Sequence, residues 1–304
     1  MAPKRKPVSR STRRRNNQNS FWDACKRFIK TVSVTATLTF GAASCALNPQ
    51  LRDHFSIDEL LAQFELKQAD TAPVAAKVDG YAQTRFADCL HFFPKQQPPI
   101  VPSARALREL CFSAFAILHS GNTKTPVFVA QRLNRSMIQQ TQHIKRNDRF
   151  YAESRLPQAE RAQLDDYRNS GFSRGHMAPA GDMHTDEAMA QSFSLANMVP
   201  QIQQHNAGAW SKIESDTRKY ILRASGDVYV FTGPVYSGAA QSIGAGRVAI
   251  PHYLFKLVYD TTTGRSWVHW HEHSATTRAG APISYDEFVR RTGLHLLPHL
   301  QQAN

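Results

Sequence analysis

GFSRGHMAPAGDM, at residues 171–183, and SLANMVPQIQQHNAGAWSKIESDTRKY, at residues 194–220, hold most of the reactive side chains that this sequence places close together. In the first segment Arg174 and His176 are two positions apart on a strand-like stretch, so their side chains point to the same side. Gly175, between them, lets the backbone pass close to neighbouring atoms. Both side chains could therefore face one anionic group.

The second segment is expected to be helical over residues 209–222. Glu214 and Arg218 lie one helical turn apart on a shoulder of the apolar stripe, where they can be partly sheltered and held rigid. Asn206 follows His176 by 30 residues and precedes Glu214 by 8. The two segments thus contribute an imidazole, an amide, a carboxylate and two guanidinium groups.

These residue types match the needs of phosphodiester hydrolysis. That reaction requires a base to activate water, cationic groups for the negative charge on the phosphoryl oxygens, and a metal or acid for the leaving oxygen. His176 is the candidate base, because an unperturbed imidazole, with a pKa of about 6.5, accepts a proton at neutral pH without a large shift. Arg174 and Arg218 are candidates for the phosphate contacts.

The order and spacing of these residues resemble the DNA/RNA non-specific endonuclease family, whose active site is a ββα-metal (His-Me) finger. The resemblance covers most of residues 110–298, because flanking stretches such as FAILHSGNTKTPVFVAQRL and VAIPHYLFKLVYD are also similar. It implies an α+β fold in which helices flank a central antiparallel β-sheet.

The resemblance also implies a role for each residue. Asn206 matches the protein ligand to Mg²⁺, with Mn²⁺ as an alternative ion, and Glu214 matches the residue that binds the ion's waters. Arg218 matches a phosphate contact, and a further family arginine corresponds to Arg149, with Arg146 as the alternative. Products would carry 5′-phosphate and 3′-hydroxyl ends.

Each residue also has a structural interpretation. A lone histidine such as His176 is more often structural, and Asn206 could be the N-cap of the helix that follows it. Glu214 and Arg218 could form a surface i,i+4 ion pair. Ser173 stands where the family most often has Asp, and serine offers no negative charge to orient Arg174. A catalytically weakened nucleic-acid-binding module is therefore an alternative function.

The surrounding sequence predicts a sheet. Strand-like runs rich in β-branched and aromatic residues recur on both sides of the two segments, and the first two are joined by a turn at Gly121 and Asn122. These runs are FSAFAILHS, PVFVAQRL, DVYVFTGPVY, RVAIPHYLFKLVYD and SWVHWHEH. The expected domain covers residues 106–304, after a connecting neck at residues 48–105 that includes a short helix, SIDELLAQFEL.

The positive charge is concentrated at the start of the chain. Residues 1–30 hold ten basic residues and one acidic residue, which is +9 of a formal net charge of +13, so the global charge does not establish nucleic-acid binding. The uncharged, small-residue stretch that follows makes residues 1–47 resemble an export signal or N-terminal membrane anchor. An exported, periplasmic or anchored protein is expected, with a mitochondrial transit peptide as the alternative and a membrane-anchored envelope interaction protein as another.

Two further groups leave alternatives open. Cys89 and Cys111 could form a disulfide or remain buried thiols. His269, His271 and His273 alternate in HWHEH and could share one strand face as a second metal site, although an exposed strand is the simpler interpretation.

The sequence thus predicts a Mg²⁺-dependent endonuclease that acts on DNA and RNA through phosphate contacts carrying little base information. It leaves open a homodimer and an inhibitor protein as further partners.

Overall fold

The computed structural model describes residues 80–301 of the 304-residue chain. The chain divides into two units, residues 1–67 and 68–304, and all described residues belong to the second. The expected leader and the expected helix SIDELLAQFEL lie outside the described residues.

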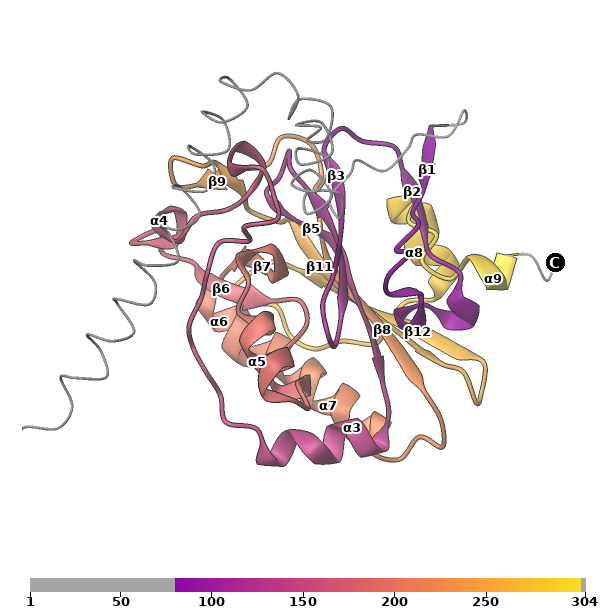
Figure 1. The fold of residues 1–304 in the computed structure, drawn as a ribbon. Helices are drawn as coiled ribbons and strands as arrows, with labels where there is room; N and C mark the ends of the chain where they lie inside the picture. Colours follow the sequence, from indigo (N-terminus) through magenta and orange to yellow (C-terminus); the bar gives the residue numbers. More distant parts are fainter. Residues whose placement is uncertain (1–79, 302–304) are drawn as a thin grey trace, which may run out of the picture. The chain divides into compact units, whose positions relative to one another are not determined.

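Six antiparallel strands form the central sheet, in the order β12-β11-β8-β5-β4-β3 (Figure 1). The strands are β3 (Leu107–Cys111), β4 (Ala116–Ser120), β5 (Thr125–Leu133), β8 (Val228–Val235), β11 (Tyr253–Asp260) and β12 (Arg265–Glu272). The predicted antiparallel sheet and the hairpin between β4 and β5 are confirmed.

One predicted strand is wrong in its extent. The run RVAIPHYLFKLVYD contains two strands, because β10 (Val248–Ala249) pairs with β9 (Ser242–Ile243) outside the central sheet and β11 begins only at Tyr253. Pro251 lies between β10 and β11, and a proline has no N–H to donate to a strand ladder.

Both faces of the central sheet are covered. In β4, the neighbouring residues Ile117 and Leu118 belong to different core clusters, because successive strand side chains point to opposite faces. In Figure 1, α8, α9, β1 and β2 lie on one side of the sheet and α3, α5, α6 and α7 on the other. These outer elements are β1 (Tyr81–Gln83), β2 (Ile100–Pro102), α3 (Arg135–Gln140), α5 (Asp186–Ser192), α6 (Gln203–His205), α7 (Ser211–Ile221), α8 (Tyr285–Thr292) and α9 (Pro298–Gln301).

The remaining elements are short. β6 and β7 form a separate antiparallel pair with α5 between them in the sequence, and a small helix, α4, precedes β6. They are α4 (Leu164–Tyr167), β6 (Ser173–His176) and β7 (Met198–Gln201), with 3₁₀ turns at Leu90–Phe92, Pro94–Gln96, Thr141–His143, Gln158–Glu160, Ala180–Asp182 and Leu195–Asn197. Within residues 80–301, no helix is long and apolar enough to cross a membrane.

The structure places residues 80–105 inside the domain, whereas the sequence predicted that the domain begins at residue 106. β1 and β2 pair antiparallel, and Phe86 and Phe93 are buried against Phe128 of the central sheet. The Glu109 carboxylate of β3 accepts hydrogen bonds from the backbone N–H groups of Arg85 and Phe86, at 2.6 and 2.8 Å. This stretch therefore completes one face of the core.

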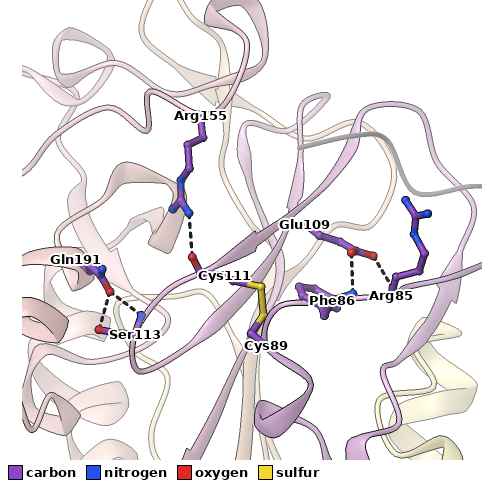
Figure 2. The surroundings of a disulfide bond; sticks show 8 residues. All are labelled: Arg85, Phe86, Cys89, Glu109, Cys111, Ser113, Arg155 and Gln191. Carbon is purple, nitrogen blue, oxygen red and sulfur yellow. Dashed lines mark hydrogen bonds between the residues drawn. A yellow bond between two sulfur atoms is a disulfide. The ribbon is translucent and has the colours of Figure 1, made fainter. Parts of the chain in front are cut away.

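A disulfide joins Cys89 to Cys111 at the end of β3, with their Cα atoms 5.8 Å apart (Figure 2). Figure 2 also shows the Cys111 carbonyl accepting a hydrogen bond from Arg155 Nη1, at 2.8 Å. The disulfide closes a loop between cysteines 22 positions apart and links residues 80–105 covalently to the central sheet. Of the two alternatives that the sequence left open, the structure shows the disulfide.

The disulfide gives a stability prediction. We expect the double variant Cys89→Ser, Cys111→Ser to lose about 3 kcal/mol in free energy of unfolding, because an unbridged unfolded chain has more conformational entropy. Urea denaturation of the oxidised, the reduced and the variant protein measures this difference. The reduced wild type should behave like the variant, and equal midpoints for the oxidised and reduced wild type would contradict the expectation.

Candidate active site

The first wall of the site is the antiparallel strand pair β6 and β7. A Cβ atom at Gly175 of β6 would lie 2.0 Å from Oε1 of Gln201, a fully buried residue of β7. Gln201 is itself fixed, because its Nε2 lies in hydrogen-bonding distance, 3.1 Å, of His205 Nδ1. Glycine is therefore required where β6 crosses Gln201, which gives the RGH motif a packing reason as well as a chemical one.

His176 is partly buried at the end of β6. Its ring contacts Phe193 edge-on, with centroids 5.0 Å apart, and lies 5.9 Å from Phe150. Burial lowers the pKa of His176 to about 3, and the positive charges of Arg146 and Arg174 also lower it. The imidazole is thus neutral at pH 7, as a proton acceptor must be. None of the described residues hydrogen-bonds its Nε2 atom.

Arg174 lies on the same side of β6 as His176. Its guanidinium carbon is 4.0 Å from the centroid of the Phe150 ring, the ring that His176 also approaches. Arg174 and Asn206 line one groove of about 600 Å³, so the groove connects β6 with the helix that carries Asn206. The structure therefore brings together residues that are 32 positions apart in the sequence.

Arg146, the alternative to Arg149 as the additional arginine, lies near the ring of His176 through Phe193. Arg146 lies over the Phe193 ring, 5.2 Å from its centroid, and forms an ion pair with Asp148 at 2.7 Å. Phe193 packs against His176, and the charge of Arg146, like that of Arg174, lowers the pKa of that imidazole. Arg149 is exposed, and its role stays a prediction.

The second wall is a continuous helix formed by α6, a π-helical turn at Asn206–Trp210, and α7. Its N-cap is Ile202, and Asn206 has helical backbone angles, with φ −59° and ψ −52°. The alternative that Asn206 is the N-cap is therefore wrong, because the N-cap is Ile202, four residues earlier. The Asn206 side chain has no capping role and is available to a ligand.

The π-helical turn changes which way Asn206 faces. In a regular α-helix, positions eight apart, such as Asn206 and Glu214, differ by about 80° around the axis. A π-helical turn accommodates one extra residue, so this pair behaves as if it were seven apart, which is about two full turns. The turn thus brings the Asn206 amide and the Glu214 carboxylate onto the same side of the helix.

Glu214 is a carboxylate in a sheltered place. Burial raises its pKa to about 7. The charge of Lys256 opposes this rise, Asp182 adds to it and Arg218 opposes it. At neutral pH the carboxyl group is therefore divided between its charged and neutral forms, and nearby cations decide the balance.

Arg218 forms an ion pair with Asp182, at 2.9 Å between Nη1 and Oδ1. Burial disfavours the charged guanidinium, but Asp182 outweighs burial and raises the pKa of Arg218. A Cβ atom at Gly181 would lie only 3.2 Å from Arg218 Nη1, so the APAGDM turn passes directly beside this arginine. Arg218 is thus held in place by Asp182, and the i,i+4 pair with Glu214 is not among the ion pairs of residues 80–301.

Lys256 is a site neighbour that the sequence analysis missed. This β11 lysine is fully buried, donates a hydrogen bond to Thr232 Oγ1 at 2.7 Å, and lies 5.6 Å from the centroid of a Trp210 ring. Burial lowers its pKa, whereas Glu214 raises it. The available signal was a lysine in the middle of the apolar strand YLFKLVY, because a buried lysine requires a partner.

The histidines of HWHEH are structural where the structure describes their contacts. His271 Nδ1 lies 3.3 Å from Nε2 of His205, while His273 accepts a hydrogen bond from the Ile202 N–H and pairs with the Pro251 carbonyl. Among the described residues, no group of three His, Cys, Asp or Glu side chains could hold a metal ion. The alternative of a second metal site in HWHEH is therefore wrong.

Ser173 supports the site in a different way from an aspartate. Its hydroxyl donates a hydrogen bond to the side-chain carbonyl of Gln203, in the first turn of the site helix. Ser173 thus ties β6 to that helix without adding charge beside Arg174.

The donor atoms at this site fit a hydrated, hard cation. An amide oxygen from Asn206 and a carboxylate from Glu214 are oxygen donors of the kind Mg²⁺ prefers. Because the described residues supply no cluster of three ionisable ligands, an ion here would keep most of its coordination as water, which suits the reluctance of Mg²⁺ to dehydrate.

Comparison with known proteins agrees with this geometry. The model of the DNA/RNA non-specific endonuclease family matches residues 99–301. Mitochondrial nuclease EXOG of Xenopus laevis is 34% identical over 194 residues, which cover 56% of this chain and 54% of the relative. Nuclease C1 of Cunninghamella echinulata is 39% identical over 123 residues, covering 37% and 48%. The chain spans about half the length of the curated relatives it matches.

A solved structure shares the fold. The crystal structure of an EndoG/EndoGI complex matches with a TM-score of 0.55 and 24% identity, covering 61% of this chain and 84% of that chain. The match supports the predicted fold class, a central antiparallel sheet flanked by helices with a ββα-metal finger made by β6, β7 and the site helix.

The position of Lys256 predicts how the pKa of Glu214 changes when this lysine is replaced. In metal-free protein, ¹³C NMR of labelled glutamate should give Glu214 a pKa of about 7, and a higher value in Lys256→Met, because removing the positive charge favours the neutral carboxyl group. Lys212→Met is the control, since Lys212 is exposed on the same helix and pairs with Asp216. An unchanged Glu214 pKa in Lys256→Met would contradict the assignment.

Proposed function

Because this chain belongs to the DNA/RNA non-specific endonuclease family, we propose that it is a metal-dependent nuclease that hydrolyses phosphodiester bonds in both DNA and RNA. The observation that carries the proposal is the groove shared by Arg174 and Asn206. Arg174 stands two residues before a histidine that is neutral at pH 7, and the π-helical turn aligns Asn206 with the sheltered carboxylate of Glu214.

In the proposed reaction, the neutral imidazole of His176 accepts a proton from the attacking water. Arg174 and Arg218 place positive charge beside the phosphate, where negative charge increases in the transition state. In its ionised form, Glu214 would accept hydrogen bonds from the water molecules around the metal ion. Mg²⁺ or Mn²⁺ held by Asn206 would supply charge for the leaving 3′-oxygen, and the products would be 5′-phosphates.

The low pKa of His176 makes it a weak base in the free protein. A phosphodiester bound at Arg174 brings a negative charge close to the imidazole, and an opposite charge within a few ångströms favours the protonated form. Substrate binding should therefore raise the pKa of His176 toward the range useful for proton transfer. Recognition through phosphate contacts also explains why the same site would accept both DNA and RNA.

The setting of this activity is also a proposal. EXOG and several other relatives are named as mitochondrial, which supports the mitochondrial alternative for the basic leader over export. The disulfide favours an oxidising compartment in either case. The similar solved structure is a complex in which EndoGI inhibits EndoG, so a protein inhibitor is a candidate partner for this chain, and a homodimer is another.

A second candidate function is a nucleic-acid-binding module without catalysis. The hydrogen bond of Ser173 to Gln203 supports this alternative, because position 173 provides no charge to orient Arg174 or His176. It predicts binding with no cleavage under any metal condition.

Digestion of supercoiled plasmid and of RNA tests the proposal. We expect the full chain to cut both with Mg²⁺ and neither with EDTA, and to yield 5′-phosphate ends. His176→Ala and Asn206→Ala should each lower the rate by at least about 100-fold, because they remove the proton acceptor and the metal ligand.

The matched controls are His143→Ala, an exposed histidine, and Gln204→Ala, an exposed side chain on the same helix as Asn206. Both should retain activity. A folded wild type that binds nucleic acid but cuts neither polymer with Mg²⁺ or Mn²⁺ would support the binding module instead.

A further inference from the structure

The groove that contains Arg174 and Asn206 extends well beyond them. Its volume is about 600 Å³, and its far wall comes from α4 and the turn that follows it. That wall is apolar and aromatic at Leu164 and Phe172, with Asn169 between them. The catalytic proposal gives these three residues no role.

Leu164 is unusual in its exposure. Only two large hydrophobic side chains are exposed among the described residues, Leu164 at 41% and Tyr151 at 36%, and only Leu164 lines the groove. An exposed apolar side chain inside a concave, polar-edged surface is typical of a ligand site.

The wall that presents Leu164 is rigid. The Asp166 carboxylate accepts hydrogen bonds from the backbone N–H groups of Gln163 and Gly246, at 2.8 and 2.6 Å, and so fastens α4 to the loop before β10. Leu164 is the first residue of α4, between Gln163 and Asp166. Its exposure is therefore fixed by the fold and does not depend on a mobile loop.

We propose that this part of the groove is a subsite for one unpaired base of the substrate strand, next to the phosphate held at Arg174 and Asn206. The inference rests on the proposed nuclease function. Leu164 and Phe172 offer apolar surface to the face of a base, and Asn169 offers amide groups to its edge. Arg174, at the shared part of the groove, gives the charge that matches the adjoining phosphate.

The subsite implies a substrate preference. A base in a duplex is paired and stacked, so it reaches a hollow in the protein only after unpairing, which costs a few kcal/mol. A base in a single strand is already unpaired, so it reaches the subsite without this free-energy cost. The structure therefore assigns single-stranded or locally unpaired DNA and RNA as the better substrates of the site.

Binding in EDTA tests the subsite without cleavage. The probe is a fluorescein-labelled eight-nucleotide single strand, measured by anisotropy against the full chain, with an abasic residue moved through each position in turn. One position should be sensitive, with binding weakened at least about fivefold when its base is missing. Leu164→Ala should weaken the intact strand similarly but leave the abasic strand and a duplex unchanged.

Tyr151→Ala is the matched control, since Tyr151 is the other exposed large hydrophobic residue and does not line the groove. It should not change binding. With Mg²⁺, wild type should cut single strands faster than a duplex of the same sequence, and Leu164→Ala should reduce that ratio.

Two results would overturn the subsite: no abasic position that matters, or equal losses for intact and abasic strands in Leu164→Ala. Unchanged binding of the intact strand by a folded Leu164→Ala variant would also overturn it. These outcomes are distinct from failure of the proposed function. Base-sensitive binding without any cleavage would contradict the nuclease function and support the subsite. Cleavage without base-sensitive binding would support the nuclease function and contradict the subsite.

Discussion

The helix that runs from Gln203 to Ile221 has to present an amide, a carboxylate and a guanidinium group to one place while its opposite side remains in the core. Trp210 and Ile213 are buried on the core side, which fixes the helix's rotation. The π-helical turn resolves the conflict, because it re-aligns Asn206 with Glu214 without moving the buried residues. The rest of the site is built around this helix, through Gln201, Ser173 and Asp182.

Charge balance is the second requirement of this arrangement. Burying an unpaired charge is costly, and Arg218 and Lys256 each lie near an opposite charge. Asp182 forms an ion pair with Arg218. Lys256 lies near Trp210 of the helix, and its charge opposes the rise that burial causes in the pKa of Glu214. These buried groups are the reason that a site made largely of charged and polar side chains can be part of a rigid domain.

The sequence predicted the central sheet, the hairpin of β4 and β5, and the two segments of the site, because strand periodicity and motif spacing are local signals. It missed the core role of residues 80–105, since the contacts of Phe86 and Phe93 are with strands far along the chain. Lys256 was missed for the same reason, as its partners lie on other elements. The sequence predicted a helix only from residue 209, whereas the helix begins at Gln203, so the sequence did not exclude Asn206 as its N-cap.

The claim on which the account depends is that Asn206 holds a divalent cation, and Mn²⁺ titration followed by electron paramagnetic resonance tests it directly. Free Mn²⁺ gives a strong signal that is lost on binding, so the number of bound ions can be counted without substrate or cleavage. The account predicts one site in wild type that is lost in Asn206→Ala and kept in Gln204→Ala. An Asn206→Ala protein that binds Mn²⁺ as wild type does would contradict it.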